Sequence, residues 1–308
     1  MAHITLDWAW NVLMNYNELL NKVENFKSKF DVLEIGQTLL KRKIFAVERN
    51  LNQNFATAIF VCSIHAREYI TTDLVCKMID DGLFEDIKDF NLSFIICANP
   101  DGVELCLNGF SSVPEIERNV LFEMNNKSND FSLWKANARG VDLNNNFDAD
   151  FKRVINSGKA GASGYAGEFA ESEIETKAIV NYLKEKNPFI ILCYHSKGEE
   201  IYFNYFQDES RLKRDKFIAE RFSKSTGYQI KNPEKTSSGG LKDYVVQKLK
   251  IPSLTIEVGD DSLNHPIGKE HLEEIYERHK FIANDLKFAY NVFREFQGNI
   301  LWHTKKNL

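Results

Sequence analysis

The chain has 308 residues, of which 43% are hydrophobic and 27% are charged. Such a composition is typical of a soluble globular protein, and the length fits one large domain or two small ones. The net charge is −5, with acidic and basic residues spread along the chain, which disfavours a nucleic-acid-binding surface of clustered Lys and Arg. No apolar run approaches the roughly 18–20 residues that a membrane-spanning helix needs.

The N-terminal segment and the cysteines bear on the cellular compartment. The first residues lack a basic stretch followed by an apolar one, so no secretory signal is visible and we expect a cytoplasmic protein. The cysteines are odd in number. We expect reduced and mostly buried thiols at Cys62, Cys76, Cys97, Cys106 and Cys193.

The N-terminal part of the chain alternates helices with strands. Leu19, Val23 and Phe26 have helical spacing and predict a helix over 17–30. The elements expected next are two extended segments within 31–48 around Gly36, a buried strand over 55–63, a helix over 69–83 and a buried strand over 92–98. The polar segment 102–132 is expected to be a surface loop.

The C-terminal part continues this alternation. The expected elements are a polar loop over 156–167, a helix over 171–186, a strand over 189–194, helices over 211–225 and 242–250, a strand over 252–258 and a long amphipathic helix over 270–296. Strands that alternate with helices predict an α/β fold with a parallel or mixed sheet. Ligand sites in such sheets form beyond the carboxyl ends of the strands.

Three short segments at these strand ends carry the candidate chemistry. They contain His65-Ala-Arg-Glu68, His195 and Glu257. Two imidazoles and one carboxylate make a three-ligand zinc site with an open fourth position, and a separate carboxylate nearby serves as the base. Glu257 is costly to bury in an apolar strand without a partner, so it is either that base or half of a structural ion pair.

Spacing alone leaves the third ligand open. Glu68 follows His65 across a strand-to-helix junction, which lets the two side chains converge. Cys62 points to the opposite strand face from His65, whereas Cys193 shares a face with His195 and is an alternative ligand. The histidines that are expected to be solvated are His3, His265, His271, His279 and His303.

The segment from Trp134 to Asp148 is dense in polar residues between apolar ones. Arg139 is a candidate for stabilising a developing oxyanion, and Asn144 and Asn145 are candidates for orienting a substrate. Taken alone, the segment is equally well explained as a polar turn.

Several motifs in order resemble the zinc carboxypeptidase (funnelin) family. They are His65-x-x-Glu68, Asn99-Pro-Asp-Gly102, Arg139-Gly-Val-Asp-Leu-Asn144, His195, Ser238-Gly-Gly240 and Thr255-Ile-Glu257. The resemblance covers about residues 12–296 and implies a single catalytic domain over 1–308. The implied fold is a three-layer α/β/α arrangement with a mixed central sheet of about eight strands.

The resemblance also implies the site residues. One Zn²⁺ per chain is bound by His65, Glu68 and His195, which favours Glu68 over a cysteine, with Glu257 as catalytic base and Arg139 as oxyanion stabiliser. The substrate-binding residues that it implies are Asn144, Asn145, Lys242, Ser196 and Gly239.

The departures from the family pattern bear on the substrate. Carboxypeptidases of the family usually have an Arg that clamps the substrate's C-terminal carboxylate, and here that position is Asn145, which removes the bidentate cation. The substrate-capping Tyr falls near Lys235. The position that sets side-chain preference falls near Lys242, which suits a carboxylate on the substrate side chain or is an exposed helix lysine.

A subgroup of the family shares these departures. His195-Ser-Lys-Gly-Glu-Glu-Ile-Tyr202, Ile70-Thr-Thr72 and Trp134-Lys-Ala-Asn137 resemble the γ-D-glutamyl-diamino acid endopeptidases, which cut peptidoglycan stem peptides between γ-D-glutamate and diaminopimelate. The leading hypothesis is therefore a cytoplasmic zinc peptidase with a peptide or muropeptide substrate, and without nucleic-acid or membrane partners.

Three alternatives stay open. The first is a metallocarboxypeptidase that removes C-terminal residues from ordinary peptides and uses Lys242 or another cation for the terminal carboxylate. The second is an amidohydrolase that removes acyl groups from small amino-acid derivatives. The third is a catalytically silent muropeptide-binding protein, which the complete set of ligands and base disfavours.

Overall fold

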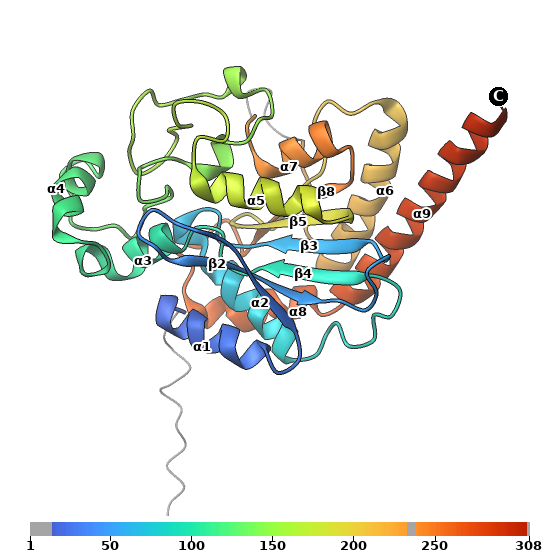
Figure 1. The fold of residues 1–308 in the computed structure, drawn as a ribbon, viewed down its shortest axis with the longest axis horizontal. Helices are drawn as coiled ribbons and strands as arrows, with labels where there is room; N and C mark the ends of the chain where they lie inside the picture. The colour runs from blue at the N-terminus through green and yellow to red at the C-terminus, as the bar shows by residue number, and fades with distance from the viewer. Residues whose placement is uncertain (1–13, 233–237, 307–308) are drawn as a thin grey trace, which may run out of the picture.

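The computed structural model describes residues 14–232 and 238–306, which contain one mixed sheet of eight strands (Figure 1). The pairs β1–β2, β2–β4 and β6–β8 are antiparallel, and the pairs β3–β4, β3–β5, β5–β8 and β6–β7 are parallel. This confirms the α/β fold and the mixed sheet of about eight strands. In spatial order the strands are β1 (Asp31–Gln37), β2 (Lys43–Arg49), β4 (Asn91–Ile95), β3 (Thr57–Val61), β5 (Pro188–Ser196), β8 (Ser253–Val258), β6 (Glu200–Tyr202) and β7 (Gln229–Ile230).

Helices cover both faces of the sheet, which is why β3 and β4 are buried at every position. Side chains alternate along a strand, so Phe60 of β3 packs in one core and Ile59 in the other. Figure 1 shows the helices on the two sides. The Phe60 side has α1 (Tyr16–Phe26), α2 (Ile70–Asp80), α6 (Glu209–Thr226), α8 (Leu272–His279) and α9 (Ile282–Lys306), and the Ile59 side has α5 (Ile174–Glu185) and α7 (Leu241–Tyr244).

Two helices occupy the segment 102–132 that the sequence predicts as a loop. α3 (Pro100–Asn108) begins after Asn99, whose side chain accepts a hydrogen bond from the Gly102 N–H. α4 (Glu115–Met124) buries only Leu121, so it has almost no apolar face for periodicity to detect. The prediction of a loop here is wrong.

Other predicted boundaries also differ from the structure. Gly36 lies inside β1, at a register shift in its pairing with β2, and does not separate two segments. The helix expected over 270–296 is two helices, α8 and α9, separated by Lys280 and Phe281. Neither Gly nor Pro marks this break, so the sequence lacks the usual signal for it.

The histidines expected to be solvated include one in the core. His279 is 1% exposed, and its Nδ1–H donates to the Ile275 carbonyl at 2.8 Å, one turn earlier on the buried face of α8. Burial lowers the pKa of His279 to about 4. His265 and His271 are partly buried, while His3 and the side chain of His303 lie outside the described residues.

None of the helices in the described ranges is both long enough and apolar enough to cross a membrane.

Candidate metal centre and substrate cleft

The carboxyl ends of three parallel strands meet at one edge of the sheet and carry the predicted ligands and base. His65 and Glu68 follow β3, with Glu68 in a short 3₁₀ turn (Ala66–Glu68). His195 lies near the end of β5, and Glu257 of β8 is its register partner. Residues that are far apart in the sequence therefore lie side by side.

The two imidazoles and the Glu68 carboxylate converge on one point. His65 Nδ1 lies 2.9 Å from Glu68 Oε1, and His195 Nδ1 lies 2.9 Å from Glu68 Oε2. The two Nδ1 atoms are 3.1 Å apart. The three residues are 5%, 3% and 1% exposed, in chain order, so water does not satisfy these polar groups.

This arrangement fits a bound cation. Two Nδ1 atoms 3.1 Å apart share at most one proton, because two facing N–H groups would collide. A single cation satisfies both imidazole lone pairs and the carboxylate together, and two His with one carboxylate are typical zinc ligands. Burial opposes ionisation of Glu68, but the charge of His65 and hydrogen bonds from both imidazoles hold the pKa of Glu68 well below its usual range.

Among the described residues, no cysteine joins this group of potential ligands. Cys193, the alternative ligand, is buried in the core, with its Sγ 3.8 Å from Ser253 Oγ. Cys62 is buried in the core on the other face of the sheet. The geometry therefore favours Glu68 as the third ligand.

Asp142 lies at the Nε2 side of the His65 ring. Asp142 Oδ1 lies 3.3 Å from His65 Nε2, and its Oδ2 lies 3.3 Å from the Lys135 ammonium. A carboxylate behind a ligating imidazole holds the ring so that the other nitrogen faces the metal. Sequence reasoning missed this role, although Asp142 lies within the motif that ends at Asn144.

A cavity of about 440 Å³ opens beside the metal ligands. It contains four of the sequence-predicted residues besides His65, namely Glu257, Asn144, Asn145 and Lys242. Its lining is His65, Lys135, Asn144, Asn145, Val154, Ile155, Tyr202, Ser238, Gly240, Lys242, Asp243, Thr255 and Glu257. We call this cavity the cleft.

Glu257 has the properties of a base that works near neutral pH. Burial raises the pKa of Glu257 to about 7, and the neighbouring charge of Glu68 adds to the increase. A carboxylate with such a pKa can both accept and release a proton close to pH 7. Its position opposite His195 in the β5–β8 pairing places it next to the metal ligands.

Contacts within the cleft wall account for the positions of Asn144, Asn145 and Gly239. Asn144 Oδ1 accepts the Leu241 N–H at 2.9 Å, which ties the wall to α7. Gly239 has a φ of +81°, and a Cβ there would lie 2.8 Å from the Asn145 carbonyl oxygen. Gly239 therefore packs behind Asn145, and its neighbours Ser238 and Gly240 line the cleft instead.

Ser196 lies beside the metal ligands. Its N–H donates to Glu68 Oε2 at 3.4 Å, and its buried Oγ has no hydrogen-bond partner among the described residues. Lys235, which the family pattern aligns with a capping Tyr, lies outside the described residues.

Arg139 is not among the residues that line the cleft, so this geometry gives no support to its predicted role as oxyanion stabiliser. Its side chain is 51% exposed, and its Nε lies 3.4 Å from Glu173 Oε2. It lines a separate cavity of about 320 Å³ that contains none of the metal ligands. Asn144 of the same motif lines the cleft, and the tight turn at Gly140, with a φ of +71°, lies between Arg139 and Asn144.

Besides Lys242, the cleft is lined by a second lysine, Lys135. Its ammonium pairs with Asp142 and contributes to the electrostatic environment of Glu257. Burial lowers the pKa of Lys135, but the charges of Asp142 and Glu68 outweigh burial and raise it. Lys135 therefore stays protonated beside the metal ligands.

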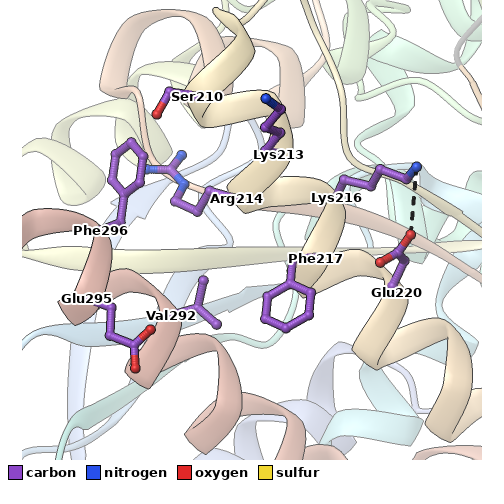
Figure 2. Close-up of a pocket in the computed structure, with 9 residues that line it drawn as sticks. All are labelled: Ser210, Lys213, Arg214, Lys216, Phe217, Glu220, Val292, Glu295 and Phe296. Carbon is purple, nitrogen blue, oxygen red and sulfur yellow. Dashed lines mark ion pairs between the residues drawn. The ribbon is translucent and has the colours of Figure 1, made fainter. Parts of the chain in front are cut away.

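A third cavity, of about 550 Å³, lies between α6 and α9 (Figure 2). It is lined by Lys213, Lys216 and Phe217 among others, and Lys216 pairs with Glu220 at 3.7 Å. It contains none of the residues that the sequence predicts for a site. The cleft beside His65 is therefore the candidate functional site.

The sequence profile of the zinc carboxypeptidase family matches residues 16–280. This chain belongs to the zinc carboxypeptidase family. The family uses Zn²⁺, and His65, Glu68 and His195 form a group that is able to hold it. The protein is accordingly a zinc metallopeptidase, and the hypothesis of a catalytically silent binding protein loses its support.

Similar proteins agree with this membership. The chain is 27% identical to γ-D-glutamyl-L-diamino acid endopeptidase 1 of Lysinibacillus sphaericus over 283 residues, which cover 85% of this chain and 69% of the relative. Bovine thrombin-activatable fibrinolysis inhibitor has the same fold, with a TM-score of 0.74, 17% identity and coverage of 93% of this chain and 99% of that chain.

A bacterial neighbour is more distant in structure. The murein-tripeptide amidase of Escherichia coli O157 superimposes with a TM-score of 0.52 and 17% identity, over 82% of this chain and 90% of that chain. These likenesses in structure establish the fold of this zinc carboxypeptidase family member.

Proposed function

We propose that this zinc peptidase hydrolyses the bond between γ-D-glutamate and diaminopimelate in peptidoglycan stem peptides. The observation that carries the proposal is Asn145, a neutral residue that lines the cleft at the position where carboxypeptidases have their carboxylate clamp. Without a bidentate cation there, recognition of a free C-terminus loses its main device. The names of the relative from Lysinibacillus sphaericus and of the murein-tripeptide amidase support the same substrate class.

The charge around Arg67 also supports a γ-linked substrate. Arg67 lies next to the ligand Glu68, and its buried Nε has no hydrogen-bond partner among the described residues. Its positive charge acts on His265 and on Lys135. A γ-glutamyl bond leaves the α-carboxylate of glutamate free near the scissile amide, and a guanidinium beside the metal ligands suits that anion.

The chain's residues have distinct roles in this proposal. His65, Glu68 and His195 would hold a Zn²⁺ ion, which would supply Lewis acidity for a substrate carbonyl and for water. The Glu257 carboxylate accepts a proton from the attacking water and delivers it to the leaving amine. The Lys135 ammonium stabilises the negative charge that develops on the carbonyl oxygen.

The test is hydrolysis of L-Ala-γ-D-Glu-meso-diaminopimelate by zinc-loaded protein, followed by mass spectrometry. We expect free diaminopimelate and L-Ala-D-Glu, and we expect a chelator to abolish their release. The matched control peptide has the same residues with an α-glutamyl bond and should resist cleavage. Cleavage of the α-linked peptide alone would contradict the proposal and leave an ordinary peptidase.

The second candidate is a metallocarboxypeptidase of ordinary peptides. Lys242 favours it, because a cation in the cleft can take the place of the missing clamp. Peptides with a free or an amidated C-terminus separate the two functions, because only a carboxypeptidase requires the free carboxylate. A γ-D-glutamyl tetrapeptide that is cut internally would decide for the endopeptidase.

A further inference from the structure

Asn137 is a buried asparagine between the two charged residues that lie behind His65. It is 1% exposed and belongs to a segment outside the helices and strands. The Lys135 ammonium lies 3.3 Å from Asp142 Oδ2, although six residues separate the two in the sequence. A segment without regular structure needs specific contacts to bring two such charges together, and Asn137 provides several of them.

Hydrogen bonds of Asn137 close a short loop over residues 137–141. Asn137 Oδ1 accepts the N–H groups of Arg139 and Val141, both at 3.0 Å. The Asn137 N–H donates to the Val141 carbonyl at 2.9 Å, and the Asn137 carbonyl accepts the Gly140 N–H at 3.1 Å. These contacts bring residue 141 back beside residue 137, so the chain segments that carry Lys135 and Asp142 meet at the closed end of the loop.

The side-chain amide of Asn137 also anchors this loop to the start of α5. Its Nδ2 donates to Glu173 Oε2 at 2.9 Å and to Glu175 Oε2 at 3.3 Å. Glu173 is 1% exposed and directly precedes α5. A primary amide has two donor and two acceptor positions, so Asn137 uses all four. A buried polar network that is fully satisfied favours one arrangement of its members.

We infer that Asn137 is a positioning residue that holds Lys135 and Asp142 in place beside the metal ligands. Asn137 is not among the residues that line the cleft, so it acts on the reaction through these two residues. The inference rests on the proposed function, in which the Lys135 ammonium stabilises the developing oxyanion, and on the contact between Asp142 and His65.

Loss of Asn137 should therefore change two properties of the site at once. Displacement of the Lys135 ammonium removes a donor from the oxyanion, which lowers kcat more than it changes KM. Displacement of Asp142 removes the carboxylate behind His65, which weakens zinc binding. A change at Lys135 affects mainly the first property and a change at Asp142 mainly the second, so a change at Asn137 combines the two.

The experiment compares Asn137→Ala with Asn91→Ala and the wild-type protein. For Asn137→Ala we expect kcat to fall about 10²-fold, the factor for one oxyanion donor, and zinc affinity to fall about 10-fold. Wild-type values of both in a folded Asn137→Ala variant would overturn the inference.

Asn91 is a matched control for the loss of a buried asparagine. It is 5% exposed, and its Oδ1 accepts the Leu51 N–H at 2.8 Å. Asn91 begins β4 opposite Thr57, the first residue of β3, whereas His65 follows the end of β3. Asn91→Ala should therefore lower the unfolding temperature, while its kcat and zinc affinity stay those of the wild type.

A double-mutant cycle separates positioning from a general loss of stability. Because the effect of Asn137 on kcat passes through Lys135, Asn137→Ala should lower kcat no further in a protein that already carries Lys135→Met. Residues that act independently give losses that multiply. Multiplied losses in the double variant would therefore overturn the positioning role.

A reversed hydrogen bond provides a second test that does not depend on Asn137→Ala folding. Asn137→Asp keeps the acceptor for the loop N–H groups but turns a carboxylate toward Glu173, so kcat and zinc affinity should fall. Adding Glu173→Gln supplies an amide donor to that carboxylate and should restore both. A folded double variant with values no higher than those of Asn137→Asp would contradict the inference.

The two measurements separate the inference from the function on which it rests. Zinc affinity, measured by competition with a chromogenic chelator, requires no substrate. If the wild-type protein cleaves no γ-D-glutamyl peptide, the proposed function fails, and the zinc affinities of Asn137→Ala and Asn91→Ala still decide whether Asn137 positions the site. If the wild-type protein cleaves the peptide and the two variants do not differ, the inference fails and γ-D-glutamyl hydrolysis stands.

Discussion

The cleft contains two groups of buried charged side chains, and only one of them requires an added cation. The group of His65, Glu68 and His195 presents two imidazole lone pairs and a carboxylate to one point, and its exposure is 5% or less. The pair of Lys242 and Asp243 is as deeply buried but neutralises itself. The first group requires an added cation, whereas the second is complete without one.

We infer from this difference that the first group takes part in the reaction, whereas the second contacts the substrate. A group that needs a cation to be satisfied creates a reactive centre when the cation arrives. A pair that is already neutralised needs no added ion, and its position in the cleft wall lets it contact the side chain of a substrate. The two groups also differ in the elements that carry them, because the ends of adjacent parallel strands position the first and the short helix α7 carries the second. Changes at the first should affect turnover, and changes at the second should affect preference.

The largest effect is expected for Glu257→Gln. The amide cannot accept the proton from water, so kcat should fall about 10³-fold, within the range for general-base catalysis, while zinc content is unchanged. Glu175→Gln is the matched control. Burial also raises the pKa of Glu175 to about 7, but Glu175 does not line the cleft. Full activity of the Glu257 variant would show that another group is the base.

The same residue predicts the pH profile of the wild-type protein. Because burial raises the pKa of Glu257 to about 7, the carboxylate is protonated and inactive as a base below that pH. Activity of the zinc-loaded protein should therefore fall as the pH drops, and this decrease should lie below pH 7 because a bound cation favours the carboxylate. The dependence of kcat/KM on pH measures this decrease, and a flat profile from pH 5 to 8 would argue against Glu257 as the base.

A smaller loss is expected for Lys135→Met than for Glu257→Gln. Removing one stabilising donor for an oxyanion costs about 10²-fold in kcat, and KM should change less. Arg139→Met is the matched control, because Arg139 lies in the neighbouring cavity and pairs with Glu173. If the Arg139 variant lost activity and the Lys135 variant kept it, the original prediction from the motif would be restored.

These two residues show how far the sequence determines the site. The candidate metal ligands and Glu257 were predicted to lie together because they are at the ends of apolar strands, and the carboxyl ends of neighbouring parallel strands meet at one edge of the sheet. Lys135 and Arg139 belong to one segment without regular structure, where spacing does not say which side chain faces the cleft. The fold was also predicted only in part. The buried strands were predicted from their apolar runs, whereas α4 was not, because it buries only Leu121.

The smallest effect is expected for Asp142→Asn. Asp142 contacts the Nε2 side of His65 at 3.3 Å, so the variant should leave the three ligands in place and weaken zinc affinity about 10-fold, at the low end for a carboxylate behind a ligating imidazole. Competition with a chromogenic chelator measures the affinity. Asp148→Asn is the matched control on the same segment, because Asp148 is 52% exposed and pairs with Lys248. Unchanged affinity in the Asp142 variant would mean that the strand ends alone orient the imidazole, and that the loop wall contributes only to the substrate side of the cleft.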